Sequence, residues 1–388
     1  MAKLQCYLSL VLMSCAGIFT RLEAHYPKEQ ESDSAELRLI STVFRHGDRT
    51  MDPTVGEFYP TDPNNNFNYY PYGKGQLTNE GKRRAYQFGR MLKQRYNNFL
   101  GDIYYQPNIH ARSTELTRTK MTLQLVLAGL YPPPRIQRWN LNLMWQPVNI
   151  QYNANITKDG LLFPYNCPTY QQKLLKVSQT PKAIAEEKQF DDLKEEMTKY
   201  TGKNITSLTG LFGLYHTLYT EYYLGLPLPE WTQKVFPYGR LYDASILQYN
   251  MLSYNDELTK LNGGVLLHRM IQDMKEVING TSVDKKINLF SAHDLNVIAM
   301  LQALGVYNNI FPSFSSAVII ELLEKKGNYF VKVLYYLGIP AEIVELQIPG
   351  CDVMCPFNKF VNLRLAATAP DEEDPNCPRN LPDSPFKF

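Results

Sequence analysis

The chain contains little tryptophan, histidine and cysteine, with 3, 6 and 6 copies among its 388 residues. After residue 24 no run of about eighteen apolar residues occurs, so we expect no membrane-spanning helix there. Long runs of lysine or arginine are also absent and the net charge is only +2, which gives no support to a nucleic-acid partner. The serine-esterase motif Gly-x-Ser-x-Gly is missing. No group of His, Asp and Glu has metal-ligand spacing, so we expect no metal.

Composition places the chain among globular proteins. Its residues are 44% hydrophobic and 20% charged, which provides enough apolar material for one large domain or two modest ones. The sequence also contains 27 tyrosines and 25 prolines. This content indicates long, structured, aromatic-rich connections rather than disorder.

The first 24 residues have the pattern of a signal peptide. Lys3 supplies a positive start, and residues 4–19 form an apolar run of the length of a signal-peptide core. We predict cleavage between Ala16 and Ala24; a signal anchor is the alternative, although the run is short for a membrane span. Residues 371–388 are polar and proline-rich, so we expect no membrane anchor there. The mature protein should therefore be secreted and extracellular.

Cysteines and glycosylation sequons agree with an oxidising compartment. Cys6 and Cys15 leave with the signal peptide, and an even number remain: Cys167, Cys351, Cys355 and Cys377. Four cysteines allow three pairings, and a metal site at Cys351-x-x-x-Cys355 is an alternative that lacks a nearby histidine or second cysteine pair. Three Asn-x-Thr sequons are candidate N-glycosylation sites: Asn155, Asn204 and Asn279.

One stretch organises the rest of the chain. An apolar run over residues 37–44 predicts a strand buried on both faces, and it ends in Arg45-His46-Gly47-Asp48-Arg49. Arginine offers a rigid fork of donors that matches phosphate oxygens, and histidine is well suited to attack or to move a proton near neutral pH. Gly47 either adopts a positive φ or permits a close backbone approach. We interpret this turn as an anion site around a nucleophile; a solvated basic turn is the alternative.

Downstream, strands and helices alternate in the pattern of an α/β fold. We predict strands at 37–44, 108–112, 287–291, 317–323 and 329–336, an edge strand within 139–150, and helices at 77–100, 115–130 and 295–304. Thr78 and Thr114 are the expected N-caps of the first two helices, and the strands at 317–323 and 329–336 should form a hairpin across Lys326-Gly327-Asn328. We expect a mainly parallel sheet flanked by helices, with the α/β core at 36–150 and 236–388 and an inserted, mostly α-helical cap at 151–235. Three strands would then deliver His46, Arg112 and His293 to one sheet edge, where such folds bind ligands.

These segments resemble the signature of the histidine acid phosphatases. The residues Arg45-His46-Gly47-Asp48-Arg49-Thr50 match its first half and His293-Asp294 its second, and Arg112-Ser113-Thr114 matches an Arg-Ser-Thr segment that opens a helix. The similarity extends from about residue 36 to about residue 377, and it is strongest to the secreted acid phosphatases of insects, including the venom type. It implies disulfides Cys351–Cys355 and Cys167–Cys377, and it makes a homodimer possible.

The resemblance also implies a mechanism. His46 would attack phosphorus and form a phosphohistidine intermediate, with a general-base role as the alternative, and Asp294 would donate a proton to the leaving group. Three arginines and a histidine would bind the phosphoryl oxygens without a metal or cofactor: Arg45, Arg49, Arg112 and His293. The expected substrates are small phosphate monoesters.

Electrostatics predict an acid pH optimum for that reaction. Neighbouring arginines should lower the pKa of His46 and keep its lone pair available in acid, while a bound phosphate should raise the pKa of Asp294. Asp294 could instead be a plain helix N-cap. The remaining histidines are interpreted as structural or surface residues: His110, His216 and His268. Two other functions stay open, a phosphatase restricted to lysophosphatidate or inositol phosphates and a secreted phosphate-ligand binder on an inactive scaffold.

Overall fold

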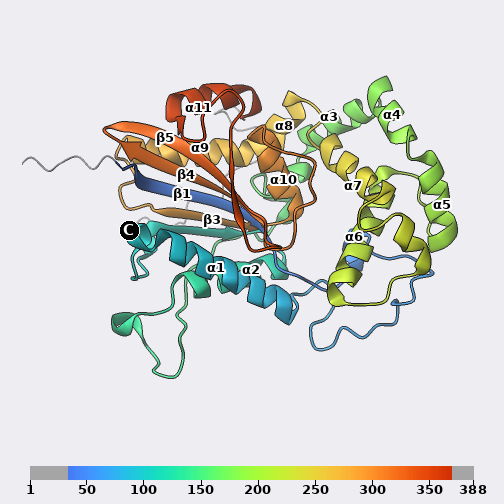
Figure 1. Cartoon of the computed structure of the whole chain (residues 1–388), viewed down its shortest axis with the longest axis horizontal. Coiled ribbons are helices and arrows are strands. Elements are labelled where there is room, and N and C mark those ends of the chain that lie inside the picture. Colours follow the sequence, from blue (N-terminus) through green and yellow to red (C-terminus); the bar gives the residue numbers. More distant parts are fainter. Residues whose placement is uncertain (1–33, 369–388) are drawn as a thin grey trace, which may run out of the picture.

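A seven-stranded sheet forms the centre of the computed structural model, which describes residues 34–368 (Figure 1). The strand order is β2-β3-β1-β4-β5-β6, and β7 pairs with β5. The strands are β1 (Glu36–Arg45), β2 (Ile109–Ser113), β3 (Ile287–Ala292), β4 (Ala317–Lys325), β5 (Asn328–Tyr336), β6 (Ile343–Leu346) and β7 (Cys355–Pro356). The predicted signal peptide lies outside the described residues.

The sheet is mixed, and its parallel part is what positions the site. β1 and β2 both pair with β3 in parallel, whereas β4, β5, β6 and β7 pair in antiparallel fashion. In the parallel register Arg45 lies opposite Ala292, and Ser113 lies opposite Ser291. The three parallel strands therefore end together. The α/β class is confirmed, but parallel pairing is confined to one side of the sheet.

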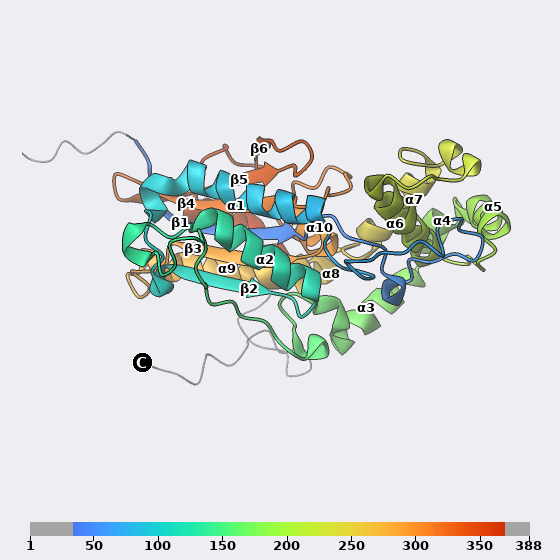
Figure 2. The ribbon, with the colours of Figure 1, turned by 90° about the horizontal axis from the view of Figure 1, so that it is seen from below.

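Helices cover both faces of the sheet. α1 (Asn79–Leu100) and α2 (Thr117–Leu130) pack on one face, where they lie in front of the strands in Figure 2. On the opposite face lie α9 (Gly263–Ile278), α10 (Asp294–Ala303) and α11 (Phe357–Arg364). Alternate side chains of β1 contribute to the two cores: Leu39 and Val43 to one, Ile40 and Phe44 to the other. β1 is thus buried on both faces, as its apolar sequence predicts.

The helical insertion stands beyond the carboxyl ends of the parallel strands (Figures 1 and 2). It contains α3 (Pro168–Ser178), α4 (Pro181–Lys188), α5 (Asp191–Thr201) and α6 (Leu208–Leu224), and it is followed by α7 (Arg240–Met251) and α8 (Asp256–Leu261). Its hydrophobic cluster also includes Leu241 of α7, beyond residue 235, together with Tyr59 and Phe314 from the core segments. These two aromatic side chains join the cap to the loops at the sheet edge.

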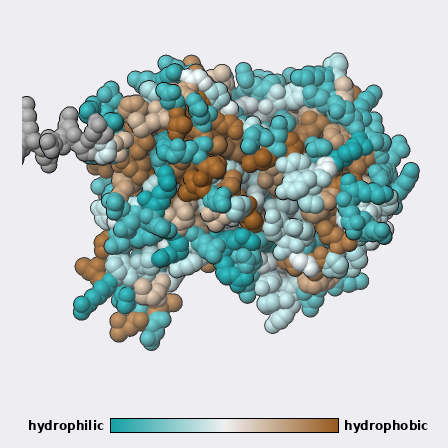
Figure 3. Space-filling view, viewed as in Figure 1, coloured by the Kyte–Doolittle hydropathy of each residue, from teal (hydrophilic) through white to brown (hydrophobic). Residues whose placement is uncertain are grey.

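Two sequence-based expectations about local structure are wrong. Residues 139–150 contain no strand. The next residue, Gln151, forms an isolated bridge to Arg112 of β2, and Pro147 has no N–H to donate to a ladder. Several hydrophobic side chains of this segment are exposed, among them Leu141 and Met144. Figure 3 shows hydrophobic residues on the protrusion at its lower left, where this segment lies in Figure 1. In addition, Thr114 does not cap α2, which begins only at Thr117.

Other local predictions are confirmed. Thr78 caps α1 by accepting a hydrogen bond from the Gly81 N–H. β4 and β5 form the predicted hairpin, and Lys326 and Gly327 both adopt positive φ at its two-residue turn. The Cys351–Cys355 disulfide is present. Cys167 is also disulfide-bonded, but its expected partner Cys377 lies outside the described residues. Among the described helices, none has the length and apolar character needed to cross a membrane.

Candidate active site

The carboxyl edge of the parallel strands gathers the predicted histidines. His46 follows β1 and His293 follows β3, and their ring centroids lie 5.5 Å apart. Thr114 follows β2, and its Oγ1 atom is 3.1 Å from Nε2 of His293. Segments separated by more than 150 positions in the sequence therefore meet because their strands are neighbours in one parallel ladder.

The local backbone fixes the orientation of the His46 ring. Its Nδ1 atom lies 2.9 Å from the carbonyl oxygen of Gly47, which can only accept a hydrogen bond. Nδ1 is therefore the protonated nitrogen, and Nε2 carries the lone pair. A Cβ atom on Gly47 would lie 2.3 Å from the carbonyl oxygen of Gly81, so glycine is required here by close backbone approach rather than by positive φ.

The surroundings of His46 keep it neutral. Its side chain is buried, and burial lowers its pKa well below the usual value; Arg118, Arg49 and Arg45 lower it further. His293 experiences the same effects, first from burial and then from Arg118, against which Asp294 acts in the opposite direction. Both imidazoles thus remain uncharged in mild acid, and His46 retains a lone pair that can attack an electrophile.

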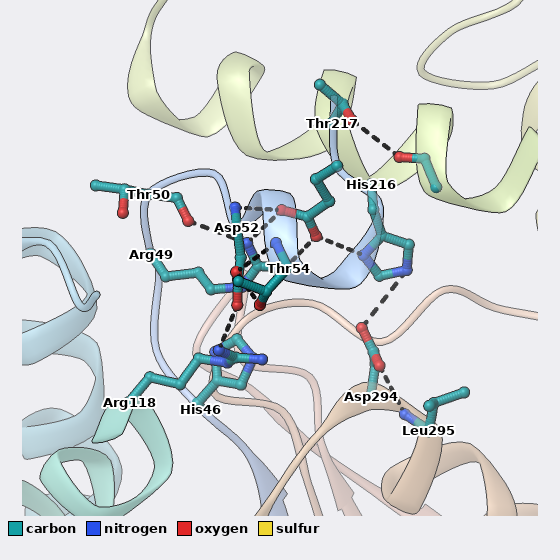
Figure 4. Close-up of polar contacts among 12 residues, drawn as sticks. His46, Arg49, Thr50, Asp52, Thr54, Arg118, His216, Thr217, Asp294 and Leu295 are labelled. Carbon is teal, nitrogen blue, oxygen red and sulfur yellow. Dashed lines mark hydrogen bonds and ion pairs between the residues drawn. The ribbon is translucent and has the colours of Figure 1, made fainter. Parts of the chain in front are cut away.

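Three arginines surround this histidine, and each forms an ion pair with a carboxylate. Figure 4 shows two of them, Arg49 and Arg118, beside His46. The pairs are Arg45 with Asp294 at 3.0 Å, Arg49 with Glu57 in a bidentate arrangement, and Arg118 with Asp52 at 3.0 Å. Arg45 is further held by the carbonyl oxygen of Pro312 and lies 4.3 Å from the ring centroid of Phe314. These contacts preorganise the three guanidinium groups around His46.

Arg112, which we expected in this cluster, lies elsewhere. Its guanidinium group forms a buried ion pair with Asp159. The arginine charge with the largest effect on the pKa of both His46 and His293 is that of Arg118. Arg118 takes that place, because α2 begins at Thr117 and presents its first turn to the sheet edge. The geometry therefore favours Arg118 over Arg112 as the third arginine. From the sequence we placed the helix start directly after Thr114 and did not identify Arg118, which lies in the first turn of the observed helix.

Asp294 lies at the start of α10, where His293 is the N-cap residue. Its Oδ1 atom accepts a hydrogen bond from the Leu295 N–H at 2.7 Å, and its Oδ2 atom contacts Arg45. Burial opposes ionisation of this carboxyl group, but the charge of Arg45 and, only when they are protonated, those of His216 and His293 lower the pKa of Asp294 below its usual value. Asp294 therefore joins the ion-paired cluster around His46 through Arg45.

His216 is a site residue that the sequence analysis did not identify. It lies on α6 of the cap, and its Nε2 atom is 3.7 Å from Oδ2 of Asp294 (Figure 4). No local pattern marks it, because it sits within a largely apolar helix and reaches the site only when the cap docks. The other two histidines stay outside the site as expected: His110 packs against Phe290, and His268 lies on α9 beside Gln272.

Within residues 34–368, no group of three or more His, Cys, Asp or Glu side chains is placed to hold a metal ion. The buried Nε–H groups of Arg45, Arg49 and Arg118 have no hydrogen-bond partner among these residues. Donors of this kind suit the oxygens of an anion such as a phosphoryl group.

Comparisons with known proteins agree with this geometry. The family model "Histidine phosphatase superfamily (branch 2)" matches residues 36–336. The chain is 43% identical over 350 residues to the venom acid phosphatase Acph-1 of Apis mellifera, covering 90% of this chain and 89% of that protein. It is 33% identical over 350 residues to the prostatic acid phosphatase of Homo sapiens, covering 88% of each.

A solved structure supports the same fold. The phytase of Hafnia alvei in complex with tartrate superposes with a TM-score of 0.66 at 18% identity, and the match covers 90% of this chain and 99% of that one. The family match and the relatives together establish the class of the enzyme: the chain belongs to branch 2 of the histidine phosphatase superfamily and is a histidine acid phosphatase, a phosphomonoesterase.

Proposed function

We propose that the chain is a secreted acid phosphatase that hydrolyses phosphate monoesters through a phosphohistidine intermediate on His46, with Asp294 as the proton donor. One observation carries this proposal. A buried neutral imidazole directs the lone pair of Nε2 from a fixed ring in the middle of three arginines. A nucleophile in a cationic cradle is suited to phosphoryl transfer, in which positioning and charge stabilisation provide most of the rate acceleration.

The reaction proceeds in two balanced steps. Nε2 of His46 forms a bond to phosphorus while the bond from phosphorus to the leaving oxygen breaks, and Asp294 transfers its proton to that oxygen. Water then attacks the phosphohistidine and Asp294 accepts a proton from it, which releases inorganic phosphate and regenerates the imidazole. Asp294 acts first as an acid and then as a base, so one carboxyl group serves both steps.

The arginines hold the phosphoryl oxygens through both steps. Arg45, Arg49 and Arg118 are paired with carboxylates, so the site with neutral histidines has no large excess positive charge before substrate arrives. A bound phosphoryl group competes with Asp294 for Arg45 and adds negative charge beside it. Both effects raise the pKa of Asp294 toward the protonated form that step one needs. An acid optimum follows, because acid supplies this proton while His46 stays neutral.

We extend the proposal to secretion, glycosylation, a second disulfide, the domain division and the oligomeric state. A signal peptide at residues 1–24, glycans on Asn155, Asn204 and Asn279, and a Cys167–Cys377 disulfide would suit an extracellular enzyme. The three asparagines are exposed, and the similar protein of Apis mellifera is a venom acid phosphatase. We also propose the division into a core at 36–150 and 236–388 with a cap at 151–235, and a homodimer.

The test is hydrolysis of an aryl phosphate by the purified protein from about pH 4 to about pH 8 with excess chelator, beside His46→Ala. The wild type should be active in acid, and brief mixing with phosphate-labelled substrate should trap label in an acid-labile, alkali-stable linkage. The variant should lose both activity and label, by several powers of ten in rate. Full activity of the variant, or label on another residue, would contradict the proposal.

A further inference from the structure

His216 stands between two carboxylates that belong to different parts of the site. Its Nδ1 atom is 3.9 Å from Oε1 of Glu57, and its Nε2 atom is 3.7 Å from Oδ2 of Asp294. Nε2 also lies 3.3 Å from the hydroxyl group of Tyr249. The imidazole is buried between Phe212 and Phe311, whose ring centroids are 4.4 and 5.1 Å away. The aromatic contacts hold the ring in this position.

Glu57 selects the tautomer of His216. Burial opposes its ionisation, but the charge of Arg49 and hydrogen bonds from this guanidinium group lower the pKa of Glu57, so it is a carboxylate that can only accept hydrogen bonds. A neutral imidazole has one N–H group, and Nδ1 is the nitrogen that faces this acceptor. The proton therefore belongs on Nδ1, which leaves the lone pair of Nε2 facing Asp294 and Tyr249.

The lone pair on Nε2 of His216 favours the protonated form of Asp294. An ionised carboxylate offers no hydrogen to Nε2, whereas a protonated carboxyl group can donate its O–H to it. The Tyr249 hydroxyl group can satisfy Nε2 when Asp294 is ionised, so the acceptor is not left unpaired in either state. Other charges that face the ring are Arg45 and Arg49, which with burial lower the pKa of His216 to about 4 against the opposing effect of the two carboxylates.

We propose that His216 is a positioning residue for the reaction: held by Glu57, it accepts a hydrogen bond from protonated Asp294 and so keeps the proton donor loaded and aimed at the leaving oxygen. The inference rests on the proposed function of Asp294. It also gives the cap a part in the chemistry, since α6 supplies a ring that the α/β core lacks. When Asp294 gives its proton to the leaving oxygen, its hydrogen bond to Nε2 is lost and Tyr249 replaces it.

The proposal predicts a dependence on the leaving group. An alkyl phosphate expels a strongly basic alkoxide that needs the proton, whereas 2,4-dinitrophenyl phosphate expels a weakly basic phenolate that does not. The quantity to compare is kcat/KM, which reports events up to formation of the phosphoenzyme. His216→Phe keeps the ring among its aromatic neighbours but removes both nitrogens. We expect it to lower kcat/KM about 100-fold for an alkyl phosphate and less than about threefold for the dinitrophenyl ester.

Three companion variants sharpen the test. His216→Gln places an acceptor near the position of Nε2 and should restore part of the alkyl phosphate activity, and it decides the question if the Phe variant does not fold. Asp294→Asn should also lower kcat/KM more for the alkyl phosphate than for the dinitrophenyl ester, and the difference should be larger than in His216→Phe. His110→Phe, at a part-buried histidine that packs on Phe290 outside the site, should leave both substrates unaffected.

Several outcomes would overturn the inference. Equal losses for both substrates in His216→Phe would indicate a purely structural role, and no loss for either would show that the residue is dispensable. If Asp294→Asn has no leaving-group pattern while His46→Ala is inactive, Asp294 is not the donor, and the proposed role of Asp294 fails together with that of His216. If wild-type protein forms no phosphohistidine, the proposed function itself fails.

Discussion

The side chain of His46 is oriented by its own neighbour, because Nδ1 lies 2.9 Å from the carbonyl oxygen of Gly47. The N–H of Gly47 in turn donates to Oγ1 of Thr122 on α2, and its Cα packs against the backbone of Gly81 on α1. The attacking ring is therefore held by backbone that two helices clamp in place. Such a ring needs little reorganisation before attack, which is the condition under which positioning accelerates phosphoryl transfer.

Arg118 and Arg112 should respond differently to replacement by alanine. Arg118→Ala removes a guanidinium group beside His46, and we expect kcat/KM for an aryl phosphate to fall about 100- to 1,000-fold. Inhibition by inorganic phosphate should weaken in parallel. Arg112→Ala instead leaves buried Asp159 without its partner, so we expect it to lower the free energy of unfolding by about 3–5 kcal/mol.

Steady-state kinetics and denaturant unfolding of the two variants check this assignment. The controls are Arg118→Lys, which retains the charge without the fork of donors, and a double variant Arg112→Ala/Asp159→Ala, which should recover part of the lost stability. If Arg112→Ala reduced phosphate inhibition as strongly as Arg118→Ala while remaining stable, Arg112 would belong to the phosphate site after all.

The acid limb of the pH profile should report His46. The reactive form is the neutral ring, and burial, with Arg118 as the next largest cause, lowers its pKa well below the ordinary value of about 6.5. Activity should therefore persist as pH falls through about 6.5 and decline only at more acid pH. In Arg118→Ala the limb should move upward, because one of the charges that disfavour imidazolium is lost.

Profiles of kcat/KM for wild type and Arg118→Ala on the same substrate check this expectation, since the ionisation of the substrate then cancels in the comparison. Glu57→Gln provides the opposite change. It leaves the charge of Arg49 unbalanced beside the ring, and the limb should move to lower pH. Identical acid limbs in all three proteins would mean that these charges do not act on the nucleophile.

Glu221 should make the free energy of unfolding depend on pH between about pH 5 and about pH 8. Burial, followed by the neighbouring charge of Asp62, raises the pKa of Glu221 to about 8. At a pH below the unfolded-state pKa of about 4.5, Glu221 is protonated in both the folded and the unfolded state, and its raised pKa does not affect stability. As pH rises to about 8, the carboxyl group ionises first in the unfolded chain. The free energy of unfolding therefore decreases over this range. Glu221 should thus contribute a fall in Tm from about pH 5 to about pH 8, whereas the buried neutral histidines contribute a rise as pH approaches about 6.5.

Glu221→Gln isolates this effect, because the amide cannot ionise and keeps an oxygen that can accept from Asn64. We expect the Tm of the variant, measured by scanning fluorimetry, to rise relative to that of the wild type as pH increases from about 5 to about 8. Because the loop that carries Asn64 docks on α6 at this point, the same variant should also resist proteolysis of that loop at the higher pH. A difference in Tm between the two proteins that stays constant over this range would contradict the raised pKa of Glu221.

Particular residues show how far sequence reasoning reaches. The strand before Arg45, the helix capped by Thr78, the hairpin turn at Lys326-Gly327 and the second half of the site at His293-Asp294 depend on local patterns, and the structure places each as predicted. The prediction of an edge strand within 139–150 was wrong, because strand pairing depends on a partner backbone and not on the apolar content of the segment alone.

The sequence by itself determined the α/β class and the turn that carries Arg45, His46 and Arg49, because a buried strand with a polar end places these side chains within one local segment. Only the tertiary structure decided that Arg118 acts most strongly on the pKa of His46 while Arg112 pairs with Asp159, and that Glu57 and His216 lie beside Arg49 and Asp294. These contacts depend on where α2 begins and on how the cap docks against the sheet edge. Such placements arise from packing between segments that are distant in sequence, and no local periodicity encodes them.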